Sequence, residues 1–145
     1  MPCSTRCVPI MHDADAALFA YGSLQIPEIF AAVTGLDLKG IPACLEGFRC
    51  VQLQGLGFPG LVVAANAKAT GLVYRGLTLE AWQRLDAYED DFYERRVVTA
   101  MLSSDEKIEV QVYLLAEEGL QLALNADWTL ANLDEATVRS LLSRL

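Results

Sequence analysis

The hydrophobic pattern divides the chain into short strand-like segments separated by polar turns. An apolar run from Ala16 to Tyr21 stops at Gly22, which is typical of a buried strand. Further strands are predicted at residues 41–53, 61–65, 70–76, 96–102 and 108–115, with the last two forming a hairpin around residues 103–106. Polar residues 66–68 indicate a turn, and Phe58-Pro59-Gly60-Leu61 has the central Pro-Gly pair of a type II turn.

Three helices are expected between and after these strands. Pro27 and Gly35 bracket the first, because proline suits the first helical position and glycine the position after the last. Thr78 and Asp134 are positioned to cap the second and third helices. The apolar stripes that these two helices would bury are Leu79, Trp82, Leu85 and Tyr88, and Val138, Leu141, Leu142 and Leu145.

The order of the elements predicts an α+β fold. Strands outnumber helices and mostly follow one another, which favours a curved sheet or a barrel. The regular strand–helix alternation of a doubly wound sheet is absent. A length of 145 residues fits one domain, which we place at residues 16–145, after a polar leader at residues 1–15.

The charge balance excludes several classes of partner. The chain has 11 Lys and Arg against 19 Asp and Glu, a net charge of -8. Binding to nucleic acid requires a basic face that releases phosphate counterions, and an acidic chain is repelled by anionic membranes. No apolar run approaches the ~18 residues of a membrane span, and the leader lacks the apolar core of a secretory signal. We expect a cytoplasmic protein that binds neither nucleic acid nor membranes; its oligomeric state stays open.

Few conventional catalytic groups are available. The single histidine, His12, lies in the predicted leader, and the chain has no glycine-rich loop of the kind that binds nucleotide phosphates. Cys3, Cys7, Cys44 and Cys50 lack Cys-x-x-Cys spacing, so we expect free thiols, no metal and no cofactor. Any chemistry would then depend on carboxylates, tyrosine, arginine and main-chain N–H groups.

One concentration of such groups is the segment Tyr21-Gly22-Ser23-Leu24. A strand that stops at a glycine and leads into a helix presents several unpaired N–H groups in one direction, and glycine permits close approach to the backbone. Such a loop can hold a carboxylate or a developing oxyanion. A plain turn, with glycine for steric relief, is the alternative.

A second concentration is the charged segment from Leu85 to Arg96. The second predicted helix ends near Glu89, so Glu89, Asp90 and Asp91 lie at its negative C-terminal end, where an acid is unfavourable by about 0.3–1 kcal/mol. The same dipole favours the protonated form of Glu89, which suits a group that must take and return a proton. A solvated charge run is the alternative.

Together, the two segments resemble the γ-glutamylcyclotransferase family in its broad sense, which includes the plant AIG2-like proteins. The resemblance rests on Tyr21-Gly22-Ser23-Leu24, on Leu85-Asp86-Ala87-Tyr88-Glu89 and on Tyr93-Glu94-Arg95. Further landmarks are Phe58-Pro59-Gly60, Gly71-Leu72-Val73-Tyr74, Val112-Tyr113 and Asp127-Trp128. Asp90 stands where the family commonly has glycine.

The resemblance implies a mixed β-barrel core flanked by a few helices, with a pocket at one end of the barrel. Active family members convert a γ-glutamyl amide into 5-oxoproline and a free amine. The resemblance also implies that Glu89 is the catalytic acid/base and that Tyr21-Gly22-Ser23-Leu24 binds the γ-glutamyl group. Tyr93 and Arg95 are further candidates for substrate binding, with an ion pair to a nearby acid as the alternative for Arg95.

We therefore predict an enzyme that cleaves a small γ-glutamyl amide by attack of the substrate's own α-amine, without metal, cofactor or covalent intermediate. One alternative is a non-catalytic ligand-binding or interaction module on the same scaffold, and another is a redox or metal role for the cysteines. Tyr21, Tyr88 and Tyr93 are interpreted as packing groups with satisfied hydroxyls rather than proton donors. Trp82 and Trp128 are interpreted as core residues.

Overall fold

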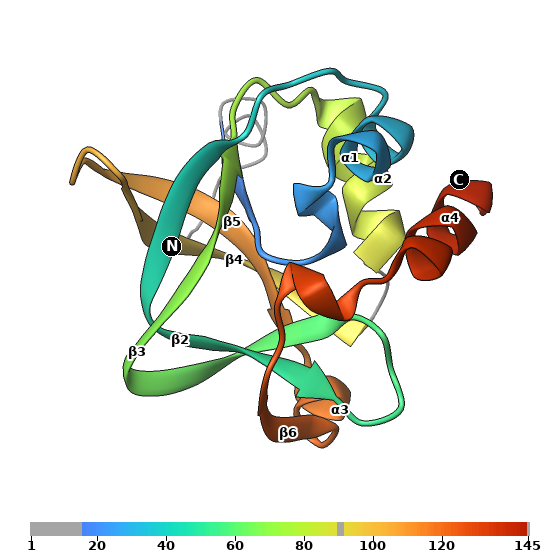
Figure 1. Cartoon of the computed structure of the whole chain (residues 1–145). Coiled ribbons are helices and arrows are strands. Elements are labelled where there is room, and N and C mark those ends of the chain that lie inside the picture. Colours follow the sequence, from blue (N-terminus) through green and yellow to red (C-terminus); the bar gives the residue numbers. More distant parts are fainter. Residues whose placement is uncertain (1–15, 90–91, 145) are drawn as a thin grey trace.

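The core of the protein is a closed β-barrel (Figure 1). This computed structural model describes residues 16–89 and 92–144. Outside the described residues lie the predicted leader, which includes Cys3, Cys7 and His12, and also Asp90, Asp91 and Leu145. Within the described part, the barrel strands are β1 (Ala17–Ala20), β2 (Ile41–Leu53), β3 (Pro59–Tyr74), β4 (Tyr93–Leu102) and β5 (Lys107–Leu115).

The strands follow the order β3-β1-β5-β4-β2, and the pairing of β2 with β3 closes the barrel. A sixth strand, β6 (Ala123–Asp127), pairs with β2 outside this ring. The barrel is mixed because β1 runs parallel to β5 while the other neighbours are antiparallel. The predicted α+β class, with a mixed barrel and a few flanking helices, is confirmed.

The helices begin and end where local chemistry predicts. Helix α1 (Pro27–Thr34) begins at its proline and ends at Gly35, which adopts the left-handed conformation with φ of 76°. Helix α2 (Leu79–Glu89) begins after Thr78, whose Oγ1 accepts a hydrogen bond of 3.1 Å from the Ala81 N–H. Asp134 caps α4 (Glu135–Ser143) by accepting a 2.7 Å hydrogen bond from the Thr137 N–H. The shorter helices are η2 (Ser23–Gln25), α3 (Glu117–Leu120) and η4 (Leu130–Asn132).

The turn predicted at residues 66–68 is wrong, because β3 runs unbroken through it. Gly47 on β2 and Asn66 on β3 have φ of 85° and 66°, and the pairing of the two strands shifts register between Glu46 and Phe48. Such bulges bend a strand and increase its twist. The polar residues therefore mark a bend that lets the long β2–β3 hairpin wrap around the barrel (Figure 1).

The type II turn predicted at Pro59-Gly60 is also wrong. Both residues lie at the start of β3, where they pair with Gln52 and Val51, and Gly60 is not among the glycines with positive φ. The glycine is needed for packing instead, because a Cβ atom there would lie 2.4 Å from Cδ1 of Leu115. Packing of the Leu115 side chain against the Gly60 backbone, rather than turn geometry, explains the glycine.

Strand β1 separates two apolar cores. Phe19 belongs to the core inside the barrel, whereas Leu18 and Ala20 belong to the core between the barrel and the helices. All four residues of β1 are buried, which explains why the sequence shows a continuous apolar run instead of alternation. The strand that leads to the predicted substrate loop is thus fixed on both faces.

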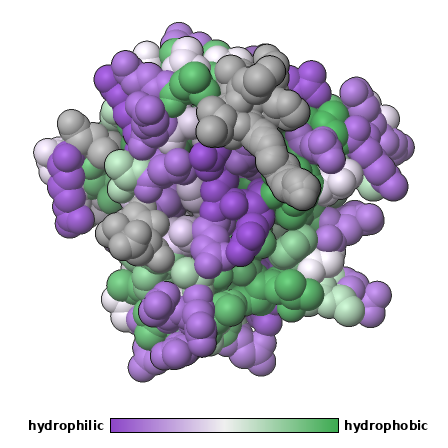
Figure 2. All heavy atoms as spheres, turned by 180° about the vertical axis from the view of Figure 1, so that it is seen from behind, coloured by the Kyte–Doolittle hydropathy of each residue, from purple (hydrophilic) through white to green (hydrophobic). Residues whose placement is uncertain are grey.

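The exposed large apolar side chains of the described residues are spread over different elements. Figure 2 shows a largely polar face with apolar side chains gathered toward its lower part, the end of the molecule where Figure 1 places α3 and β6. The exposed large apolar residues of these two elements are Leu120 and Leu124. Among the described residues, no helix is both long and apolar enough to cross a lipid bilayer.

Replacing Gly71 with alanine should weaken the joint between β1 and β3. An added Cβ would lie 2.2 Å from the carbonyl oxygen of Ala20, and a main-chain atom cannot move aside as a side chain can. We expect the Gly71→Ala substitution to lower the free energy of unfolding by about 1–3 kcal/mol or more in urea denaturation.

The matched control is Gly57→Ala, where a new Cβ would meet nothing within 4 Å and φ is not positive. We expect this variant to stay within about 0.5 kcal/mol of the wild type. Equal stabilities for the two variants would show that the Ala20–Gly71 approach does not constrain the fold.

Candidate active site

A cavity of about 610 Å³ lies where β1 ends. Its lining includes six of the residues that the sequence singled out, namely Tyr21, Gly22, Ser23, Leu24, Glu89 and Tyr93. Strand β1, the turn η2, the end of α2 and the start of β4 therefore meet at one place. The structure brings together an acid late in the sequence and a glycine loop near its beginning, while Arg95 is not part of this lining.

The loop after β1 presents main-chain N–H groups. Within η2, the hydrogen bonds are donated by the Gln25 N–H to the Gly22 carbonyl at 3.1 Å and by the Ile26 N–H to the Ser23 carbonyl at 3.0 Å. The N–H groups of Gly22, Ser23 and Leu24 precede these donors and have no partner within the turn. A cluster of such donors is suited to an anion or an oxyanion.

Gly22 also allows a close approach from the neighbouring strand. A Cβ on Gly22 would lie 3.2 Å from Cγ of Pro59, at the start of β3. The Pro59 carbonyl accepts a 2.5 Å hydrogen bond from the Tyr93 hydroxyl. The loop, β3 and β4 are thus tied together at the mouth of the barrel.

Glu89 is the last residue of α2 and is partly buried in the cavity wall. Burial raises the pKa of its carboxyl group to about 8, and the negative charge of Asp86 contributes in the same direction. Raising the pKa is the effect that the helix dipole predicts for an acid at a C-terminus, but the principal cause here is burial. Near neutral pH, Glu89 populates both protonation states.

Tyr21, Tyr88 and Tyr93 are three tyrosines that line the cavity together with this acid, and each of their hydroxyls has a partner. Tyr21 donates to the carbonyl oxygen of Tyr113, and Tyr88 shares a 2.8 Å hydrogen bond with the Ser23 hydroxyl. Tyr93 binds the Pro59 carbonyl, as described above. Burial, followed by neighbouring charges that include Glu89, raises the pKa of Tyr21 and Tyr93. These hydroxyls therefore stay protonated and position the site, in agreement with the packing interpretation.

Arg95 lies beside the cavity wall, in an ion pair with Asp86. Its Nε and one terminal nitrogen each lie 3.1 Å from a carboxylate oxygen of Asp86, and its other terminal nitrogen donates to Gln111 at 2.8 Å. The guanidinium also lies 4.7 Å from the ring centre of Trp82. The structure thus places Arg95 in the ion pair that the sequence left as the alternative to substrate binding.

Asp86 connects this ion pair to the barrel. Its Oδ1 accepts a 2.7 Å hydrogen bond from the Tyr113 hydroxyl, so one carboxylate joins α2 to both β4 and β5. Because Asp86 lies one helical turn before Glu89, this contact fixes the end of α2 over the cavity. In the sequence, Asp86 stands out only as part of the motif that ends in Glu89.

The wall opposite the barrel was missed from the sequence, apart from Leu141 in the apolar stripe predicted for the last helix. It consists of Leu133 and the residues Thr137, Ser140, Leu141 and Arg144 of the α4 region; we call these five residues the C-terminal wall. The last four recur at i, i+3, i+4 and i+7, so they share one helix face. Their mixed polar and apolar character hides that face from a search for apolar stripes.

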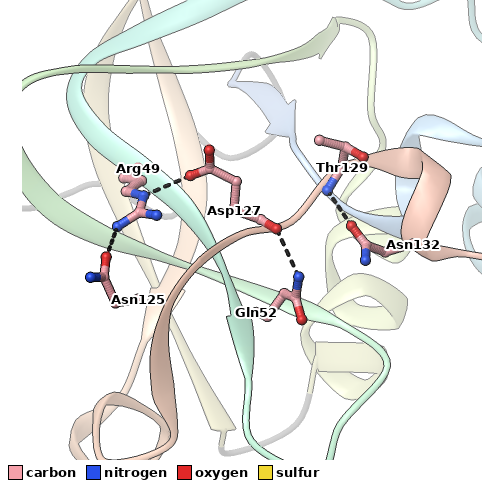
Figure 3. A network of polar contacts seen from close by, with 6 residues as sticks. All are labelled: Arg49, Gln52, Asn125, Asp127, Thr129 and Asn132. Atoms are coloured by element: carbon pink, nitrogen blue, oxygen red, sulfur yellow. Dashed lines mark hydrogen bonds and ion pairs between the residues drawn. The ribbon is translucent and has the colours of Figure 1, made fainter.

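A polar network holds the chain that leads into this wall (Figure 3). Arg49 on β2 lies 2.7 Å from Asp127 and donates to Asn125 at 2.6 Å, which fixes β6. The Thr129 N–H donates to Oδ1 of Asn132 at 2.9 Å, which closes η4. Between them, the Trp128 side chain lines the cavity, is only 5% exposed, and donates to the Gly57 carbonyl at 3.2 Å.

The cysteines that the structure describes do not form a reactive site. Cys44 and Cys50 are free and partly buried on β2. Burial raises the pKa of the Cys50 thiol to about 12, so it is protonated at neutral pH and a poor nucleophile. Among residues 16–89 and 92–144, no three His, Cys, Asp or Glu residues gather as a potential metal site.

The barrel and its helices define a γ-glutamylcyclotransferase-like fold. The chain belongs to the family described as gamma-glutamyl cyclotransferase, AIG2-like, whose model matches residues 18–130. AIG2-like protein C of Arabidopsis thaliana is 35% identical over 98 residues, which cover 67% of this chain and 57% of that protein. AIG2-like protein D of the same plant is 31% identical over 104 residues, 70% of this chain and 68% of that protein. The match to protein C thus leaves more than a third of that relative's length uncovered.

Solved structures show the same fold at lower identity. A solution structure from Arabidopsis thaliana has a TM-score of 0.70 at 23% identity and covers 90% of this chain and 88% of that one. A structure titled gamma-glutamyl cyclotransferase has a TM-score of 0.63 at 16% identity, covering 70% and 67%. An AIG2-like protein from Mus musculus has a TM-score of 0.62 at 20% identity, covering 79% and 88%.

The raised pKa of Glu89 should make the protein less stable as the pH rises. Between the ordinary value of 4.5 and about 8, the folded protein keeps a proton that the unfolded chain releases. Raising the pH through this window therefore lowers the free energy of unfolding. Urea denaturation from pH 5 to 8 should show this loss in the wild type relative to Glu89→Gln, which carries no titratable group at that position. Parallel curves for the two proteins would contradict the burial of this carboxyl group.

Proposed function

We propose that this protein is a γ-glutamylcyclotransferase that cleaves a small γ-glutamyl amide into 5-oxoproline and a free amine. One observation carries the proposal: Glu89 and the loop residues Gly22, Ser23 and Leu24 line the same cavity. Membership of the gamma-glutamyl cyclotransferase, AIG2-like family supports this class of reaction. The cytoplasmic location expected from the sequence stays a prediction.

The substrate carries its own nucleophile, so the protein needs none. The α-amine attacks the γ-carbonyl carbon, and the new C–N bond closes a five-membered ring. The bond between that carbon and the leaving nitrogen then breaks. Holding the substrate in the bent conformation exploits the high effective molarity of an intramolecular reaction, which can lower the barrier by several kcal/mol.

Glu89 transfers the proton in this scheme. Its carboxylate takes a proton from the attacking amine and returns it to the departing nitrogen, so the overall reaction neither consumes nor releases a proton. A pKa of about 8 allows the group to act in both directions near neutral pH. General acid–base catalysis of this kind contributes about 10²–10⁴ in rate.

The loop and the aromatic residues supply binding and exclusion of water. The N–H groups of residues 22–24 would bind the glutamyl carboxylate or the oxyanion of the tetrahedral intermediate. Phe58, Phe92 and Tyr93 form a cluster with ring centres 5.5–6.3 Å apart, and all three line the cavity. Apolar walls lower the local dielectric constant and so strengthen the interaction of the substrate with these donors.

The Glu89→Gln substitution should remove the activity. We expect kcat for 5-oxoproline release from γ-glutamyl dipeptides or γ-glutamyl-lysine to fall at least about 100-fold, because the amide cannot accept the proton. The control is Glu80→Gln, which changes an exposed acid of α2 that pairs with Arg84 outside the cavity. Full turnover in Glu89→Gln would exclude Glu89 as the base. A wild type that is stabilised by 5-oxoproline but forms no product would indicate the binding module instead.

The Asp86→Asn substitution should move the pH profile of the same reaction. Asp86 adds negative charge near Glu89, so its neutralisation lowers the pKa of Glu89 and shifts the acidic limb of kcat/KM to lower pH. The asparagine oxygen can still accept the hydrogen bond of Tyr113, which keeps one of the two contacts that hold the end of α2, while the ion pair with Arg95 is lost. An acidic limb that coincides with that of the wild type would exclude Asp86 as a determinant of Glu89 ionisation.

A further inference from the structure

The cavity has a wall that lies outside the match to the family model. That match ends at residue 130, whereas the C-terminal wall begins at Leu133. Helix α4 is held in place by Val138, Leu141 and Leu142, which pack on the core between the barrel and the helices. The part of the site that the family model does not describe is thus one face of a packed helix.

This wall brings a positive charge to the cavity. Of the described residues that line it, the charged ones are Glu89 and Arg144. The Arg144 guanidinium donates a 3.4 Å hydrogen bond to the Ser140 hydroxyl, and no carboxylate of a described residue pairs with it. By contrast, Arg139 on the same helix pairs with Glu135 at 2.8 Å. Arg144 is therefore available to an anionic group of a ligand.

The cavity also offers apolar surface to a ligand. Phe58, Phe92 and Trp128 contribute aromatic rings to its lining, and Leu133 and Leu141 of the C-terminal wall contribute aliphatic side chains. A volume of about 610 Å³ is within the usual range for small-molecule sites, about 300–1,000 Å³. The space accommodates a γ-glutamyl group together with a leaving group of amino-acid size.

We propose that the C-terminal wall selects the leaving group, and that this group is an α-amino acid with an apolar or aromatic side chain whose carboxylate binds Arg144. The inference rests on the proposed function, because it assigns the second half of that substrate. The products are then 5-oxoproline and the free amino acid, which together contain every atom of the substrate.

Charge explains why a cationic leaving group is disfavoured. An amine that carries a second ammonium group, such as putrescine, would bring a positive charge toward Arg144 without a carboxylate to compensate it. A hydrocarbon amine such as phenethylamine would fill the apolar space but leave Arg144 without a partner. An apolar amino acid satisfies both features of the wall.

The test compares γ-glutamyl-phenylalanine with γ-glutamyl-phenethylamide, which differs from it only by lacking the carboxylate of the leaving group. For the wild type, we expect kcat/KM to be about tenfold higher for the phenylalanine compound, since a charge-assisted hydrogen bond is lost in the other. Arg144→Gln should remove this preference by lowering kcat/KM for the phenylalanine compound alone. Arg139→Gln, a change on the same helix outside the cavity, should alter neither value.

Three kinetic outcomes would overturn the proposal. An equal loss on both substrates in Arg144→Gln would mean that Arg144 binds the glutamyl part. No loss on either would mean that Arg144 does not contact the substrate. A higher kcat/KM for γ-glutamyl-putrescine than for γ-glutamyl-phenylalanine would contradict the charge argument.

Calorimetric binding separates this proposal from the proposed function. The Glu89→Gln protein should bind γ-glutamyl-phenylalanine about tenfold more tightly than the phenethylamide, and the added Arg144→Gln change should equalise the two affinities. If the wild type forms no 5-oxoproline but this preference is present, the cyclisation is wrong and the leaving-group site stands. If 5-oxoproline forms but the preference is absent, the cyclisation stands and the leaving-group site is wrong.

Discussion

The candidate active site depends on the contact that Asp86 makes between α2 and the barrel. The Asp86 carboxylate accepts a hydrogen bond from the Tyr113 hydroxyl on β5 and forms an ion pair with Arg95 on β4. These two contacts fasten the last turn of α2 to two neighbouring strands. A helix end is ordinarily free to fray, and an acid there would turn toward water. Fastened in this way, Glu89 lies in the cavity wall, and burial supplies most of its change in acidity.

Strand β1 provides the corresponding constraint on the other side of the cavity. It has four residues, yet both its faces are buried in different cores, and Gly71 lets its carbonyl groups approach β3 closely. The loop that follows therefore starts from a rigid position. This matters because main-chain donors stabilise an anion only when their direction is set before the ligand arrives. The sequence separates the acid from the loop, and the closure of the barrel brings them together.

Much of this arrangement could be read from the sequence, and the failures have physical reasons. The run before Gly22, the caps at Thr78 and Asp134, and the motif ending in Glu89 are local signals, and the structure agrees with each as a local feature. The turns at residues 66–68 and at Pro59-Gly60 were wrong because glycine and asparagine serve bends and close packing as well as turns. The C-terminal wall depends on contacts between distant segments, which local patterns do not encode. For Arg95, the sequence offered both an ion pair with a nearby acid and a place in the site, and only the folded arrangement shows the pair with Asp86.

The protonation of Glu89 has a consequence for how ligands leave. A carboxylate ligand beside an ionised Glu89 would face a like charge, so its arrival favours uptake of a proton from the medium. 5-Oxoproline, the product of the proposed reaction, would be such a ligand, since cyclisation leaves its carboxylate intact. Its affinity should therefore weaken as the surroundings become more alkaline, and heats of binding should depend on the ionisation enthalpy of the buffer. If the proposed reaction holds, a site built around an acid of raised pKa would couple retention of the acidic product to the hydrogen-ion concentration of the medium.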